Sequence, residues 1–222
     1  MDWTAFALSL KLAAWTAAVL LPLGLLSARA LAFRVRRGKG LLEALVALPL
    51  VLPPTVLGYY LLVGLGGDSA IGQVWTRIFG HGLVFSFEGL LLASVLVNIP
   101  FAVQPMQRAF EALPLDVREA AQVSGLSPWA TFWRVELPLA WPGVLSALVL
   151  TFAHTMGEFG VVLMVGGGIP GETKTIALAI YDRTQAFDAA AAGTMSAALL
   201  AFSITAIVIV HALGARVGQR RG

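Results

Sequence analysis

Long apolar stretches are the feature that most limits how this chain can fold. Each is about as long as the roughly 20 residues that a helix needs to cross the apolar core of a membrane. The stretches are Leu12 to Phe33, Leu41 to Val63, Glu88 to Val103, Val144 to Val165 and Ala189 to Leu213. Only 12% of the 222 residues are charged, against about 25% in soluble domains. The sequence therefore predicts an all-α membrane protein of about five transmembrane helices, with its membrane domain over residues 5–213.

Lys and Arg fall unevenly on the two sides of this topology, and such residues concentrate on the cytoplasmic side of membrane proteins. Ten lie on one side and three on the other. The ten are Arg34, Arg36, Arg37, Lys39, Arg108, Arg118, Arg134, Arg216, Arg220 and Arg221, and the three are Arg77, Lys174 and Arg183. We therefore expect the N-terminus outside and a short basic tail, residues 214–222, in the cytoplasm.

Several classes of function are disfavoured by what the sequence lacks. There is no cysteine, so disulfides, thiolate catalysis and cysteine-zinc clusters are excluded. The triplets at Thr173 to Thr175 and Gly38 to Gly40 lack the glycine and hydroxyl spacing of a phosphate-binding loop. We expect no enzymatic activity, no catalytic residue, no metal or cofactor bound by this chain, and no nucleic-acid partner.

The segment from Gln104 to Trp141 is the least apolar part of the chain and predicts a helix-turn-helix. Glu111 to Gln122 is predicted as the first helix, and Gly125 as the positive-φ residue that ends it. Ser127 and Pro128 are typical of the N-cap and first turn of a second helix.

Aromatic residues give the second helix one apolar face, formed by Trp129, Phe132 and Trp133. Such a face either docks into a groove on another protein or packs against the chain's own spanning helices. The spacing alone favours neither interpretation.

The same segment contains a set of residues with a specific spacing: Glu119, Ala120, Ala121, Gly125, Val135, Glu136, Leu137 and Pro138. This spacing resembles the EAA loop of the permeases of ATP-binding-cassette (ABC) importers, with Val135 where the pattern often has Ile. The resemblance implies a type I importer arrangement in which this loop couples to a separate ATPase. Glu119 would then offer a charge to the partner, Gly125 would permit the turn, and Trp129 to Trp133 would provide the buried contact.

The same resemblance implies the partners. They are a second copy of the chain, forming a homodimer, two copies of a cytoplasmic ABC ATPase, and a periplasmic or extracellular binding protein that selects the substrate. ATP would act through the ATPase, and the chain would span the bacterial or archaeal cytoplasmic membrane in contact with lipid.

Three further stretches resemble the molybdate permease group, with sulfate permeases as the nearest relatives: Leu48 to Tyr60, Met156 to Gly160 and Ile169 to Tyr181. The resemblance implies molybdate as the substrate and a molybdate-binding protein outside, with sulfate, thiosulfate or tungstate as alternatives. An ion-coupled secondary transporter or channel would need no docking loop and usually carries paired intramembrane charges or inverted repeats. A purely structural membrane protein would leave the loop spacing unexplained.

Prolines in the second span are candidate gate residues. Pro49, Pro53 and Pro54 remove helical hydrogen bonds, so we expect this helix to be kinked or broken. The kink serves either as a gate or as ordinary helix packing.

Polar residues in the spans are candidates for the transport pathway. Thr151 and Thr155 offer weak donors, although both are also ordinary packing residues. Glu158 has the wrong sign to contact a dianion directly. We expect it to accept hydrogen bonds from the backbone or a neighbouring helix, with His154 one turn earlier as a partner.

Overall fold

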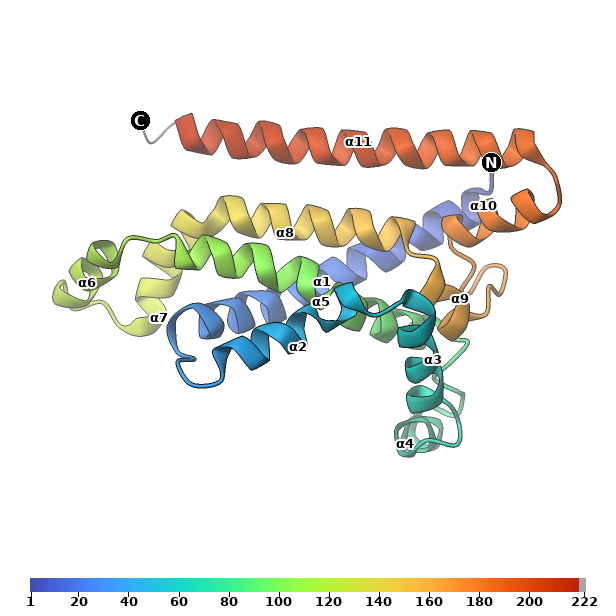
Figure 1. The fold of residues 1–222 in the computed structure, drawn as a ribbon, viewed down its shortest axis with the longest axis horizontal. Helices are drawn as coiled ribbons and strands as arrows, with labels where there is room; N and C mark the ends of the chain where they lie inside the picture. Colours follow the sequence, from blue (N-terminus) through green and yellow to red (C-terminus); the bar gives the residue numbers. More distant parts are fainter. Residues whose placement is uncertain (220–222) are drawn as a thin grey trace.

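The computed structural model describes residues 1–219, and within them all regular structure is helical (Figure 1). The helices are α1 (Trp3–Phe33), α2 (Lys39–Val51), α3 (Pro54–Leu65), α4 (Ala70–Phe79), α5 (Phe87–Glu111), α6 (Leu115–Val123), α7 (Pro128–Thr131), the π-helical turn η1 (Phe132–Glu136), α8 (Leu137–Gly157), α9 (Gly160–Gly166), α10 (Ile176–Gln185) and α11 (Ala189–Gln219). In the described part of the chain, four helical segments are long and apolar enough to cross a membrane, or five if the bent pair α2 and α3 is one span. The predicted fold class is confirmed.

Three long helices, α1, α5 and α8, pack together at the centre of the molecule. Their shared core includes Leu31 of α1, Met106 of α5 and Val144 of α8, all buried. Glycine allows the close approach of α5 and α8, because a Cβ on Gly143 would lie 2.3 Å from the Cβ of Ala109. Small residues at helix contacts are typical of membrane proteins, in which dispersion contacts replace the hydrophobic effect.

The predicted second span is two helices. A bend of 105° separates α2 from α3, and Leu52 and Pro53 lie between them in extended conformations. Pro54 then starts α3 in the first-turn position that proline favours. The expected break in this span is confirmed.

The predicted fourth span, 144–165, has the wrong boundaries. A continuous helical segment runs over Pro128–Gly157, and it ends where Glu158 adopts an extended conformation. The short helix α9 follows in a different direction and packs against α3. Apolar composition continues through the break, so hydropathy could not locate it.

Other predicted boundaries differ where polar residues continue a helix. The third span was predicted over 88–103, yet α5 continues through Glu111. Glu111 therefore ends α5 instead of starting the next helix, and α6 begins at Leu115, after Pro114. The first helix includes residues before the predicted span and starts at Trp3, where the Asp2 carboxylate accepts a hydrogen bond from the Ala5 N–H at 2.9 Å.

The last helix, α11, lies at the edge of the molecule and packs against α8 and α10 (Figure 1). Most of its described side chains are exposed, so lipid or another protein must cover them. The predicted basic tail overlaps this helix, which continues to Gln219, and residues 220–222 lie outside the described part of the chain.

Candidate functional site

The predicted helix-turn-helix is present as a hairpin formed by α6, the turn 124–127, α7 and η1, which we call the 115–136 hairpin. Gly125 has a φ of 76°, the left-handed conformation expected of it. The Leu126 N–H donates to the Ala121 carbonyl oxygen at 3.1 Å and closes α6. The Ser127 hydroxyl accepts a hydrogen bond from the Ala130 N–H at 3.2 Å, as an N-cap does.

The predicted aromatic face divides between the two interpretations that the sequence left open. Phe132 is buried in the core with Phe110, so this part of the face packs on the chain's own helices. Trp129 is 63% exposed, and Trp133 is also exposed with its ring 5.5 Å from that of Trp129. These two indoles form an apolar surface that the described chain does not cover.

The remaining residues of the predicted coupling loop differ in how far their side chains are exposed. Glu119 and Ala120 are exposed, whereas Ala121 is buried. At the start of α8, Leu137 is half-buried and Pro138 is exposed. The exposed residues among these, together with the two indoles, form a surface on the hairpin and the start of α8 that is partly apolar and partly charged.

A buried carboxylate lies at the base of the hairpin. Glu136, the last residue of η1, has a fully buried side chain that accepts hydrogen bonds from two arginines. Arg29 of α1 donates through Nε and through Nη2, the latter at 3.2 Å. Arg118 of α6 donates through Nε at 3.1 Å. We call Arg29, Arg118 and Glu136 the charge clamp.

Aromatic rings complete the surroundings of both arginines. The Arg118 guanidinium lies 3.6 Å from the centre of the Phe33 ring, and the Arg29 guanidinium 5.4 Å from that of Phe132. Cation–π contacts of this kind add to the attraction between charges where water is scarce.

Sequence reasoning missed the charge clamp. Glu136 was named within the loop pattern but was given no role, and Arg118 counted only toward the topology. Arg29 was the one useful signal, because it is an isolated charge near the end of an apolar helix and such charges are usually paired.

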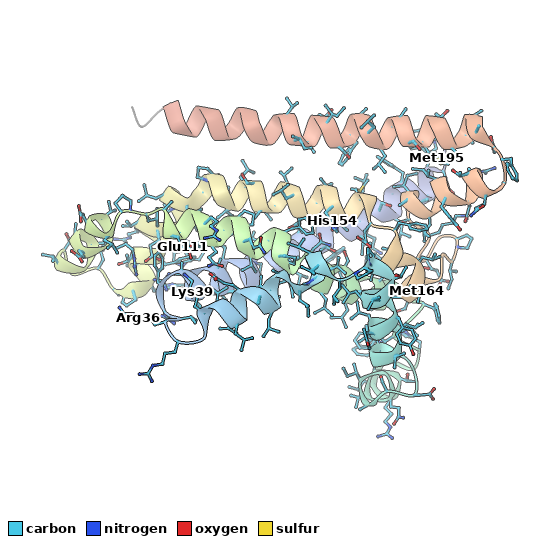
Figure 2. The ribbon with its side chains drawn as sticks, viewed as in Figure 1. Arg36, Lys39, Glu111, His154, Met164 and Met195 are labelled. Atoms are coloured by element: carbon cyan, nitrogen blue, oxygen red, sulfur yellow. The ribbon has the colours of Figure 1, made fainter. Side chains whose placement is uncertain are left out.

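A second polar cluster at the same end of the molecule joins α2 to α5. Lys39 Nζ lies 2.7 Å from Glu111 Oε1, and Gln107 Nε2 donates to the same oxygen at 2.9 Å. Figure 2 shows Lys39 and Glu111 at the end that carries α6 and α7, with Arg36 nearby pointing outward. The hydrogen bonds and ion pairs of this cluster join α2 to α5, so it is separate from the charge clamp.

The two broken spans meet around a cavity of about 190 Å³. Pro49 and Pro54 line it from α2 and α3, and His154 and Glu158 from the end of α8. Pro53 lies at the adjacent break but is not among the lining residues. The structure thus brings together three of the residues predicted for a gate or pathway.

Glu158 makes the contacts expected of it. Its Oε1 accepts a hydrogen bond from the Val161 N–H at 3.2 Å, in the first turn of α9. Its Oε2 lies 3.7 Å from His154 Nε2. His154 also contacts Asn98 through Nδ1 at 3.1 Å and stacks on Phe101, and its side chain is half-buried (Figure 2). Glu158 therefore stabilises the break between α8 and α9.

Thr151 and Thr155 do not line this cavity. Both are buried in α8, and the Thr155 hydroxyl donates to the Thr151 carbonyl oxygen at 2.8 Å. Their pathway role stays a prediction.

Comparison with known proteins shows which family this chain belongs to. The family described as "Binding-protein-dependent transport system inner membrane component" matches residues 20–222. The chain belongs to this family. The predicted family resemblance is therefore confirmed, and a channel or ion-coupled secondary transporter is no longer a competing interpretation of this permease.

Curated relatives of the permease are similar along most of its length. The molybdenum transport system permease protein ModB of Azotobacter vinelandii is 47% identical over 95% of this chain and 93% of its own length. ModB of Escherichia coli K12 is 38% identical over 83% and 80%. The sulfate transport system permease protein CysT of the same strain is 32% identical over 82% of this chain and 66% of its own length.

Solved structures share the fold. A bacterial ABC transporter involved in the import of the acidic polysaccharide alginate has a chain that aligns with a TM-score of 0.72. The alignment covers 98% of the permease and 78% of that chain at 18% sequence identity. The same transporter has been crystallised with an alginate-bound periplasmic protein.

Proposed function

We propose that this chain is the permease subunit of an ATP-driven importer that moves molybdate across the cytoplasmic membrane by alternating access. Its similarity to ModB of Azotobacter vinelandii, which extends over nearly all of both chains at 47% identity, carries the proposal. The sulfate permease relative is less similar, at 32% identity, and the chain covers only 66% of it. Molybdate is therefore favoured over sulfate and thiosulfate, and tungstate, a close chemical analogue, stays an alternative.

ATP acts through two copies of a separate cytoplasmic ATPase, and the 115–136 hairpin is the surface that docks into each copy. The exposed indoles of Trp129 and Trp133 supply apolar contact area, and Glu119 supplies an exposed charge on α6. Aromatic residues of this kind are the usual anchors of protein interfaces. No catalytic residue is needed in the permease itself.

The orientation follows from the position of the basic residues. Arg36 and Lys39 lie at the same end of the molecule as α6 and α7 (Figure 2). Because positive residues mark the cytoplasmic side, the hairpin faces the ATPase in the cytoplasm and the N-terminus lies outside, where the binding protein delivers its anion.

A homodimer is supported by the exposed break between α2 and α3. A broken helix leaves backbone carbonyls without partners, which membranes tolerate only where protein or a water-filled cavity covers them. Val51 and Tyr60, on either side of the break, are largely exposed in the single chain. A second copy of the permease covers this surface, and the cavity at the two breaks then opens to either side as the dimer moves.

Uptake into vesicles tests the proposed function. The permease is reconstituted with the ATPase and binding protein from its own gene neighbourhood, and uptake of labelled molybdate is followed with unlabelled molybdate, tungstate or sulfate in competition. We expect ATP-dependent uptake that tungstate inhibits and sulfate inhibits only at much higher concentration. Preferential uptake of sulfate would contradict the proposed substrate, and uptake without ATP would contradict the transporter class.

A further inference from the structure

The charge clamp places a fully buried carboxylate where three elements meet, α1, α6 and the start of α8. Burying an ion pair costs desolvation free energy that its own attraction often fails to recover, so such pairs are weak sources of stability. Their best-documented use is to specify one arrangement of the elements they join. This clamp lies at the base of the hairpin that is proposed to dock into the ATPase, so it can fix one arrangement of the hairpin relative to the spanning helices.

We propose that Glu136 is a positioning residue that holds the hairpin rigidly against α1 and α8, so that a displacement of the hairpin moves both spanning helices together. The inference rests on the proposed function, because it explains how motion imposed on the hairpin reaches the membrane domain. It adds a role for Arg29 and Arg118, which the loop pattern does not contain, and for Glu136, to which the pattern assigned no role.

A π-helical turn sets the face on which Glu136 lies. In a regular α-helix Glu136 would lie between the faces of Phe132, four residues earlier and buried, and Trp129, seven residues earlier and exposed. In η1 the Leu137 N–H instead donates to the Phe132 carbonyl, one residue further back than in an α-helix. The additional residue in this turn rotates Glu136 away from the side of the helix that carries Trp129. Glu136 is 0% exposed, whereas Trp129 is 63% exposed. π-helical turns within α-helices are frequent at functional sites.

The attachment of α6 depends strongly on the clamp. The main packing partners of α6 are α7 and η1, which belong to the same hairpin. Arg118 reaches beyond the hairpin, because its guanidinium lies on the Phe33 ring at the end of α1. Through Glu136 it is also joined to Arg29, 107 residues away from Glu136 in sequence.

Loss of the carboxylate charge should loosen the hairpin against α1, which then holds it through apolar contacts such as that of Phe132. In Glu136→Gln, Arg29 and Arg118 lose their common counter-ion while the side-chain volume is kept. A matched control is Glu111→Gln, which removes the ion pair with Lys39 at the same end of the molecule but touches α2 and α5 instead of the hairpin. Arg118→Gln is a second test variant, since it frees α6 and leaves the Arg29–Glu136 pair in place.

The first measurement reads the rigidity of the hairpin without relying on transport. The chain has no cysteine, so a nitroxide on Val123→Cys, a residue 89% exposed at the end of α6, reports on the hairpin alone. We expect the electron spin resonance lines of the full-length permease to narrow in Glu136→Gln and Arg118→Gln, and to stay unchanged in Glu111→Gln. Unchanged mobility in both clamp variants overturns the inference, whatever happens to transport.

The second measurement reads coupling in the assembled transporter as molybdate imported per ATP hydrolysed. Substitutions along a path that links two sites change coupling by about 2- to 30-fold, and we expect a fall in this range for both clamp variants but not for Glu111→Gln. A ratio equal to that of the wild type, in a complex that still hydrolyses ATP, overturns the inference. A wild-type complex that imports sulfate in place of molybdate refutes the proposed substrate only, and the same ratio is then measured with sulfate.

Discussion

Gly125 shows how one residue determines the shape of the proposed docking surface. Its φ of 76° lies in the left-handed region, and no atom stands within 4 Å of the position that a Cβ would occupy. A substitution there is therefore opposed by backbone strain alone and not by a steric clash. Because α6 and α7 meet at this turn, the conformation of Gly125 determines how Glu119 is placed relative to Trp129.

Substitutions at Gly125 are expected to differ in a graded way. Gly125→Pro cannot adopt a positive φ, so it should abolish uptake and co-purification of the ATPase while the chain still inserts in the membrane. Gly125→Ala costs about 1–2 kcal/mol of backbone strain, so this variant should retain part of the uptake and part of the ATPase association. Co-purification with an affinity-tagged ATPase measures the association, and normal recovery with Gly125→Pro would show that the turn is not part of the docking surface.

Glu158 is the residue at which a structural and a transport role can be separated. Glu158→Gln keeps an oxygen that can accept the hydrogen bond from the Val161 N–H, so uptake and thermal stability should stay close to those of the wild type. Glu158→Ala leaves that buried N–H without its partner, at a cost of about 1–3 kcal/mol, and should lower the unfolding temperature of the assembled complex. Loss of uptake in a normally assembled Glu158→Gln transporter would instead assign the charge itself to transport.

At the scale of the elements, helix existence was predictable and helix boundaries were not. The apolar stretches are long enough to identify α1, α5 and α11, and three prolines identify the break in the second span. The break at Glu158 was not predictable, because apolar residues continue on both sides and the extended conformation depends on a contact with α9. The inward face of Glu136 was also hidden, since a π-helical turn has no clear sequence signal.

The contact between α5 and α8 gives a prediction about packing. Gly143→Ala would place a methyl group 2.3 Å from the Cβ of Ala109 and 3.0 Å from the Pro105 carbonyl oxygen, so the two helices must separate. Overpacking of this kind costs about 1–3 kcal/mol and should lower the unfolding temperature of the purified permease. Gly157→Ala, on the same helix with open space around it, is the control and should leave that temperature nearly unchanged. Equal unfolding temperatures for the two variants would show that the α5–α8 contact is looser than described.

At the scale of the whole molecule, local patterns predicted the hairpin but not what holds it. Gly125, Ser127 and Pro128 act through neighbours in sequence, and each has the predicted role in the turn. The charge clamp joins residues from α1 and η1 that only the packing of α1 against α8 brings together. The same reason explains why Pro49, Pro54 and Glu158 were predicted separately yet line one cavity. Contacts between residues that lie far apart in the sequence can be identified only when the fold is known.

Cross-linking tests most directly whether the hairpin is the surface that meets the ATPase. Val123→Cys and, as a control at the loop before α11, Phe187→Cys are single cysteines on residues 89% and 95% exposed. In cells that express all subunits, we expect a short bifunctional reagent to join Val123→Cys to the ATPase, and an impermeant maleimide added outside to label only Phe187→Cys. Labelling of Val123→Cys from outside, with no cross-link to the ATPase, would contradict the account.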